Sequence, residues 1–205
     1  MNNIILGVIC LIAGYLFGSI NPAIILSKAK GKDVRTMGSG NAVATNMLRN
    51  YGKASAVVVL LCDVLKCVVA VILAGVLSNL MIPEFALPGK IFAAAGCIMG
   101  HNFPLYFGFK GGKGVVVSAT AIFMLDWKIG LIVLSCFIIV FAISRFVSLG
   151  SVLSACIAVV ASLFLSADEV FYFIAFAAIL TIIRHRTNIV RLIKGTESKT
   201  TFSKK

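Results

Sequence analysis

The chain has 205 residues, of which 60% are hydrophobic and 13% are charged. This apolar content excludes a water-soluble globular domain and indicates a protein that crosses a membrane several times. The formal net charge of +12 fits attraction to anionic lipid headgroups, and nucleic acid is not an expected partner because no basic element stands clear of the apolar runs.

Apolar runs follow one another along the chain and predict an all-α fold with seven transmembrane helices. They cover residues 4–27, 54–82, 91–108, 114–126, 129–147, 152–167 and 170–184. The third and fourth runs are the weakest, so a count of five, with weak runs re-entrant, is the alternative. The first run lacks the basic start and cleavage pattern of a signal peptide and is expected to remain as a helix. We expect one membrane domain over residues 1–195 and a basic cytoplasmic tail over residues 196–205.

Basic residues predict the orientation, because cytoplasmic connections carry an excess of Lys and Arg. Sixteen of the 19 lie in segments 28–53, 110–113, 144–151 and 184–205, which all fall on one side. We therefore expect the N-terminus outside, the C-terminus in the cytoplasm and an odd number of spans. The polar, glycine-containing connections then share the cytoplasmic face, as a candidate active site requires.

The first of two glycine-rich, cationic loops follows the first apolar run. It comprises Gly38, Ser39, Gly40, Asn41, Asn46 and Arg49. Glycine lets the backbone approach a ligand, and arginine can bind phosphate with two parallel hydrogen bonds, so this loop has the chemistry of a phosphate cradle. It is not a dinucleotide-binding fingerprint, because Val43 stands at the third glycine position and no strand precedes it.

The second loop places Lys113 between Gly111-Gly112 and Gly114, directly before an apolar run. Glycines on both sides predict an anion-binding nest around the lysine, and the N-terminus of the following helix adds to anion affinity. Phe107 and Gly114 occupy the places where a Walker A motif needs glycine and Ser/Thr. Nucleotide hydrolysis is therefore disfavoured.

Three other ionisable residues lie near the loops or within the runs. His101 precedes the second loop, but Tyr106 stands where the His-x-x-x-x-Asp motif of common glycerolipid acyltransferases has its acid, so no His–Asp dyad supports base catalysis in that manner. Asp63 and Lys66 lie three apart in the second run and are expected to pair with each other or with polar loop groups. The six cysteines lie in or beside apolar runs without a Cys-x-x-Cys pair, and we interpret them as packing residues rather than metal ligands.

Together these segments resemble the bacterial acyl-phosphate:glycerol-3-phosphate acyltransferases, called PlsY. The resemblance covers almost the whole chain and rests on motifs at residues 38–49, 100–114 and 147–151, with an Arg-His-Arg-x-Asn segment near the end. Val43 and Cys67 stand where the family usually has glycine.

The resemblance implies a seven-helix enzyme of the bacterial cytoplasmic membrane with its active site on the cytoplasmic face. It would transfer a fatty acyl group from acyl phosphate to the 1-hydroxyl of glycerol 3-phosphate, giving lysophosphatidic acid and phosphate in the first acylation of phospholipid synthesis. Attack would be direct, without a covalent acyl-enzyme, and the departing phosphate would take the hydroxyl proton. No cofactor, no metal and no obligatory protein partner is implied. The partners are the two substrates and membrane lipid.

The expected site draws on all of these motifs. The catalytic set is His101, Ser39, Arg49 and Lys113. The substrate-binding set is Gly38, Gly40, Asn41, Asn46, Gly111, Gly112, Gly114, Ser148, Ser151 and Asn188. We expect Ser39, Gly40, Asn41 and the 111–114 nest to hold acyl phosphate. Glycerol 3-phosphate is assigned to Arg49, Lys113, Ser151 and Asn188, with Ser148 the second choice for the serine and His101 orienting a phosphate or the hydroxyl.

Three alternatives account for part of the pattern. A transporter for an organic phosphate explains the basic loops, but it predicts a site at the bilayer midplane and two related halves. A CDP-alcohol phosphotransferase needs several aspartates in one motif, which this chain lacks. A lipid-binding scaffold leaves the His101 and Asn188 segments without a purpose.

Overall fold

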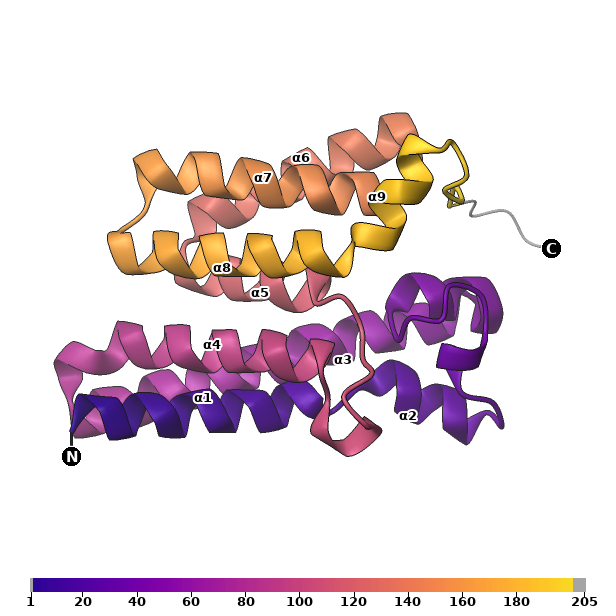
Figure 1. Cartoon of the computed structure of the whole chain (residues 1–205). Coiled ribbons are helices and arrows are strands. Elements are labelled where there is room, and N and C mark those ends of the chain that lie inside the picture. The colour runs from indigo at the N-terminus through magenta and orange to yellow at the C-terminus, as the bar shows by residue number, and fades with distance from the viewer. Residues whose placement is uncertain (1, 201–205) are drawn as a thin grey trace. The chain divides into compact units, whose positions relative to one another are not determined.

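The computed structural model describes residues 2–200, and over these residues the secondary structure is entirely helical (Figure 1). The all-α prediction is confirmed. The chain divides into two compact units, Met1–Ala121 and Ile122–Lys205. The single-domain organisation expected for residues 1–195 stays a prediction.

The first unit is built on four α-helices, α1 (Asn3–Ser19), α2 (Pro22–Ala29), α3 (Ala44–Met81) and α4 (Ala86–Asn102). Three 3-10 turns connect them, η1 (Val34–Thr36), η2 (Pro83–Phe85) and η3 (Leu105–Phe107). Helix α1 lies alongside α4, and α3 contacts both (Figure 1). Helix α5 (Val115–Leu125) follows the second glycine loop and crosses the boundary between the units.

Glycines bring α1 and α4 into close contact. A Cβ atom on Gly14 would overlap the backbone carbonyl of Ala93, and one on Gly96 would overlap the carbonyl oxygen of Leu11. Small residues at such an interface allow two backbones to approach, which strengthens packing between membrane helices. This contact fixes the end of α4, from which His101 projects.

We expect Gly14→Ala to lower the free energy of unfolding by about 1–3 kcal/mol, because the added methyl meets backbone rather than a flexible side chain. Helix propensity acts in the opposite direction by about 1 kcal/mol, so only the clash can produce a loss. Gly7→Ala is the matched control on the same helix, where the new methyl meets side chains rather than backbone, namely the rings of Phe92 at 3.0 Å and Phe85 at 3.4 Å. Thermal unfolding in detergent measures both variants, and equal midpoints would contradict the close contact.

Two boundaries in the first unit differ from the apolar runs. The run over residues 4–27 is interrupted, because Asn21 caps a new helix by accepting a hydrogen bond from the Ile24 N–H at 3.1 Å and Pro22 occupies its first position. Helix α3 begins at Ala44 and is broken at non-helical Gly52, so the part after the break matches the run expected from residue 54 and the part before it was not expected. Asn46 and Arg49 therefore lie on a helix rather than in a loop.

The second unit contains α6 (Trp127–Ser144), α7 (Val147–Leu165), α8 (Asp168–Arg184) and α9 (Arg186–Ile193). Helix α7 contacts both α6 and α8. Helix α9 bends away from α8 by 59° at a one-residue break (Figure 1). No apolar run marked α9, because it is short and contains several polar and charged residues.

The lengths of the helices support a membrane protein of several spans. Among the described residues, four segments are long and apolar enough to cross a bilayer, and the bent pair α8–α9 gives a fifth. Helix α5 has 11 residues and is about 16 Å long, roughly half of the hydrocarbon thickness. The count of seven spans and the orientation stay predictions.

Candidate active site

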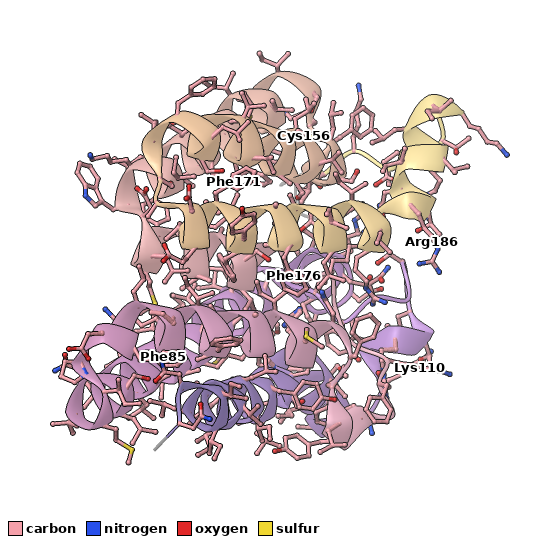
Figure 2. The ribbon with its side chains drawn as sticks, turned by 60° about the vertical axis from the view of Figure 1, so that its left-hand side comes forward. Phe85, Lys110, Cys156, Phe171, Phe176 and Arg186 are labelled. Carbon is pink, nitrogen blue, oxygen red and sulfur yellow. The ribbon has the colours of Figure 1, made fainter. Side chains whose placement is uncertain are left out.

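The predicted residues of the first unit gather where the two glycine loops meet. Lys110 marks this end of the unit, and Phe85, before α4, lies at the opposite end (Figure 2). We call residues 33–50 and 101–114 together the loop cluster. The structure brings the first two motifs together here, although about fifty residues of sequence, occupied by α3 and α4, separate them.

Asn46 organises the first loop from the buried side of α3. Its Nδ2 group donates to the carbonyl oxygens of Val34, Met37 and Asn41, each at 3.0 Å. Its Oδ1 atom accepts a hydrogen bond from the Ser39 N–H at 3.2 Å. Because its amide is fully used in this way, the role supported for Asn46 is to shape the loop that presents Ser39, rather than to contact a ligand.

Glycine is required at two positions of this loop by the backbone. Gly38 and Gly40 have φ angles of +52° and +69°, in the left-handed region that other residues rarely adopt. A Cβ at Gly38 would also lie 2.5 Å from the Asn46 Oδ1 atom. Val43, in contrast, has an extended backbone with φ of −139°, so the valine found where the family usually has glycine causes no backbone strain.

Arg35 joins the two loops and was not among the expected site residues. Its Nη1 group donates to the carbonyl oxygens of Phe107 at 2.8 Å and Lys110 at 3.1 Å. Its Nε and Nη2 groups bind the carboxylate of Asp33, the closest distance being 2.8 Å. The hydrogen bonds from Arg35 hold the pKa of Asp33 below its ordinary value, against the opposing effect of burial.

The glycines of the second loop serve a different purpose from the one expected. The N–H groups of Gly111 and Gly112 donate to the carbonyl oxygens of Asn102 and His101 at 3.3 and 3.1 Å, so they satisfy the end of α4. Only Gly114 among the glycines at 111–114 has a positive φ, +75°. Anion affinity in this loop therefore rests on Lys113 and the start of α5, and not on the amides of Gly111 and Gly112.

His101 has an acidic partner that lies far from it in sequence. The Nδ1 atom lies 3.2 Å from the Asp63 Oδ1 atom and 3.0 Å from the Lys66 Nζ atom. The sequence excluded a dyad of the His-x-x-x-x-Asp kind, and the acid that the structure places beside His101 is of another kind. That motif places the acid five residues further along, whereas Asp63 reaches His101 from a different helix. The predicted pairing of Asp63 with Lys66 is confirmed, at 2.8 Å.

The two cations expected to bind phosphate differ in their surroundings. Arg49 is exposed on the first part of α3, whereas Lys113 is only 9% exposed within the second loop. The loop itself lies against both the first loop and His101, since a Cβ on Gly112 would overlap the His101 Nε2 atom and lie 2.7 Å from the Ala42 carbonyl oxygen. Lys113 is thus carried by a loop with little freedom to move.

The remaining predicted residues gather in the second unit around the carboxylate of Glu197. Its Oε1 atom accepts hydrogen bonds from Ser148 at 2.8 Å and Asn188 at 2.6 Å, and its Oε2 atom accepts one from Arg191 at 2.7 Å. We call these four residues the Glu197 cluster. Ser151 is buried beside it on the first turns of α7 and donates to the Val147 carbonyl oxygen at 2.8 Å.

Part of the predicted tail folds back to supply this carboxylate. The Thr200 N–H donates to the Arg145 carbonyl oxygen at 2.9 Å, and the Lys199 ammonium lies 5.7 Å from the centre of the Phe146 ring. Residues 201–205 of that tail lie outside the described residues. Burial opposes ionisation of Glu197, but the hydrogen bonds from Arg191, Asn188 and Ser148 outweigh it and hold its pKa below the ordinary value.

Sequence reasoning missed three functional candidates, Arg35, Asp63 as the partner of His101, and Glu197. The sequence did contain a signal for Glu197, because it is the only acidic residue after Glu169 and stands in a strongly basic segment. Asp63 carried a signal as a charged residue within an apolar run, but its contact with His101 is known only once α3 and α4 are assembled. Arg35 carried no comparable signal.

Comparisons with known proteins agree over nearly the whole chain. A family model described as glycerol-3-phosphate acyltransferase matches residues 8–195. A glycerol-3-phosphate acyltransferase of Mesorhizobium japonicum is 39% identical over 193 residues, covering 94% of this chain and 95% of the relative. One from Shouchella clausii is 42% identical over 196 residues, covering 91% and 92%.

Solved structures give the same result at the level of the fold. A crystal structure of PlsY (YgiH), an integral membrane glycerol 3-phosphate acyltransferase in its glycerol 3-phosphate form, has a TM-score of 0.86 and 31% identity, covering 95% of this chain and 96% of that one. The lysophosphatidic acid form of PlsY has a TM-score of 0.83 at the same identity.

Proposed function

Because the chain belongs to the glycerol-3-phosphate acyltransferase family, as an integral membrane enzyme of the PlsY type, we propose that its acyl donor is an acyl phosphate. The enzyme transfers the acyl group to the 1-hydroxyl of glycerol 3-phosphate and releases lysophosphatidic acid and inorganic phosphate. We place the protein in the bacterial cytoplasmic membrane, with seven spans, the N-terminus outside and the reaction at the cytoplasmic face.

The observation that carries this proposal is the meeting of the two glycine loops around buried His101. Both substrates present a phosphate, and the loop cluster supplies Arg49 and Lys113 beside an organised backbone. Charge-assisted hydrogen bonds from such groups are the usual means of holding phosphate. The chemistry of the loop cluster therefore fits two substrates that each carry a phosphate.

Direct transfer requires little covalent chemistry from the protein. An acyl phosphate is an activated mixed anhydride, so the glycerol hydroxyl can attack its carbonyl carbon while the bond to the phosphate oxygen breaks. We propose that the departing phosphate takes the hydroxyl proton and that no acyl-enzyme forms. The protein then acts by holding the two substrates in position and by stabilising the negative charge on the leaving phosphate.

We assign the substrates to residues as follows. Acyl phosphate is held by Ser39, Gly40, Asn41 and the loop at 111–114, where Gly114 and the start of α5 contribute rather than the amides of Gly111 and Gly112. Glycerol 3-phosphate is held by Arg49, Lys113, Ser151 and Asn188, with His101 orienting a phosphate or the hydroxyl. The described geometry supports two refinements: Asn46 acts on the loop backbone, and Ser148 and Asn188 share the carboxylate of Glu197.

The donor is tested with purified protein, radiolabelled glycerol 3-phosphate, and palmitoyl phosphate or palmitoyl-CoA, without added metal. We expect labelled lysophosphatidic acid only with palmitoyl phosphate. Product from palmitoyl-CoA alone would overturn the donor and keep the acyl transfer. If folded protein gave no product with either donor, transport of an organic phosphate would become the leading alternative.

Arg49→Ala and Lys113→Ala are each expected to lower kcat/KM for the acyl transfer. The loss of one charge-assisted hydrogen bond to phosphate corresponds to about 1.5–3 kcal/mol, or about 10- to 150-fold. Lys53→Ala is the control, because it removes an equal charge from an exposed position near Arg49. Steady-state kinetics with each substrate varied in turn measures the effect, and unchanged kinetics in both variants would refute the phosphate assignment.

A further inference from the structure

A buried cluster of three polar side chains joins His101 of the loop cluster to two residues of α3. Asp63 and Lys66 are one turn apart on α3, and His101 is on the last turn of α4. Their side chains are only 4–6% exposed. The Asp63 Oδ1 atom lies 2.8 Å from the Lys66 Nζ atom and 3.2 Å from the His101 Nδ1 atom. We call these three residues the buried cluster.

A contribution to the stability of the fold does not by itself explain why these charged groups are buried. Removing two charges from water has a large cost, and well-packed apolar residues of similar volume usually stabilise a protein as well as a buried ion pair or better. Ionisable residues within membrane segments are rare for the same reason and generally serve function. The contacts of the buried cluster indicate what that function is.

Lys66 ties the cluster to a third helix. Its Nζ atom donates to the carbonyl oxygens of Gly18 at 3.1 Å and Ile20 at 2.8 Å. These carbonyls lie at the C-terminal end of α1, where the helix leaves acceptors unpaired and its dipole favours a cation. One ammonium group therefore holds the end of α1, the middle of α3 and the end of α4 at fixed positions.

His101 connects the buried cluster to the second loop. Its Nδ1 edge faces Asp63 and Lys66, and its Nε2 edge faces Gly112 so closely that a side chain there would overlap it. The Gly112 N–H also donates to the His101 carbonyl oxygen at 3.1 Å. Any shift of the imidazole must therefore displace the loop that carries Lys113.

We propose that Asp63 and Lys66 are positioning residues of the acyltransferase, which act through His101 to hold the second glycine loop in its reactive arrangement. This inference rests on the proposed function, because it assigns to His101 and Lys113 their roles in the acyl transfer. Asp63 and Lys66 themselves touch neither substrate.

The kinetic test is a double-mutant cycle between the buried pair and the histidine. Asp63→Asn keeps the shape of the side chain and removes its charge, Lys66→Gln removes the charge with a shorter side chain, and His101→Gln removes the imidazole. We expect each single variant to lower kcat/KM for palmitoyl phosphate and glycerol 3-phosphate by about 10- to 100-fold. Each double variant with His101→Gln should be no slower than the slower of its singles, because the pair acts only through the histidine.

The controls remove the same charges from exposed positions, with Glu84→Gln matched to Asp63→Asn and Lys128→Gln matched to Lys66→Gln. Both controls are expected to retain wild-type kinetics. Additive losses in the cycle, or wild-type kinetics in folded Asp63→Asn and Lys66→Gln, would overturn the positioning role. Failure of both variants to fold would also overturn it, since the pair would then serve the fold alone.

A second measurement does not depend on the reaction. Amide hydrogen exchange of residues 108–114 in the substrate-free protein is expected to accelerate in Asp63→Asn and Lys66→Gln and to remain unchanged in the two controls. If wild-type protein made no product but exchange accelerated as expected, the proposed function would fail while the link from the pair to the loop would stand. If wild-type protein were active and exchange did not change, the positioning role alone would be wrong.

Discussion

Replacement of Gly112 by alanine is expected to lower kcat/KM by about 100-fold or more. The added methyl would overlap the His101 Nε2 atom and lie 2.7 Å from the Ala42 carbonyl oxygen. The imidazole is held on its other edge by Asp63 and Lys66, so any movement of it would break those contacts. The second loop must move instead, and it carries Lys113 out of position.

The matched control for this substitution is Gly108→Asn in the same loop. Gly108 has a left-handed backbone, with φ of +66°, and a Cβ there meets no atom within 4 Å. Asparagine tolerates this conformation better than most residues, so near-normal kinetics are expected. Steady-state assays with palmitoyl phosphate compare the two variants. Normal activity of Gly112→Ala would mean that the loop does not lie against His101 in the working enzyme.

Replacement of Glu197 by glutamine is the second change with a large expected effect. Glutamine retains one acceptor for Ser148 and Asn188, but its NH2 group is a donor and would face the donating Nε–H of Arg191. Two opposed donors in a poorly exposed position destabilise the cluster. On the proposed assignment of Asn188 to glycerol 3-phosphate, we expect kcat/KM to fall at least about 10-fold, because Asn188 loses its fixed position.

Glu169→Gln is the control for Glu197→Gln, since it removes an exposed carboxylate from the same unit. It is expected to leave kinetics and the thermal midpoint unchanged. Equal behaviour of Glu169→Gln and Glu197→Gln would show that the carboxylate of Glu197 does not organise Ser148 and Asn188.

The pH dependence of stability provides an independent check on Glu197. Its pKa is lowered in the folded protein from an ordinary value of 4.5, so the ionised form stabilises the fold. This contribution is complete above the unfolded pKa and is lost as the pH falls through the folded pKa. The difference in thermal midpoint between wild type and Glu197→Gln should therefore be constant between pH 6 and 8 and should shrink below about pH 4.5.

The apolar runs were sufficient to predict an all-helical membrane protein, because bilayer-spanning segments need long stretches of apolar side chains. They located helices at each of the seven expected places. The bounds of the runs differ from those of the helices where a helical segment is polar. Residues 44–51 are helical but polar, so α3 begins before its apolar run. Helix α9 is too short and too polar to form an apolar run.

The sequence motifs predicted which segments form the candidate site, but they did not predict the contacts between the side chains of those segments. Gly112 was expected to help bind an anion through its backbone, whereas the structure gives its N–H to the end of α4 and leaves no room for a side chain. Asp63 and His101 are far apart in sequence, and only the packing of α3 on α4 places them together. Periodicity and spacing describe one segment at a time, so they carry no information on such pairs.

The hydrogen bonds by which Arg35 of the first loop binds the second loop have a consequence for the energetics of turnover. A single guanidinium binds the carbonyl groups of Phe107 and Lys110 while it is held by Asp33 in the first loop. Opening either loop requires these hydrogen bonds between the loops to break. The conformational entropy of both loops is therefore lost when the chain folds, before substrate binds. Substrate binding then need not order these segments, and more of its intrinsic affinity remains for lowering the reaction barrier.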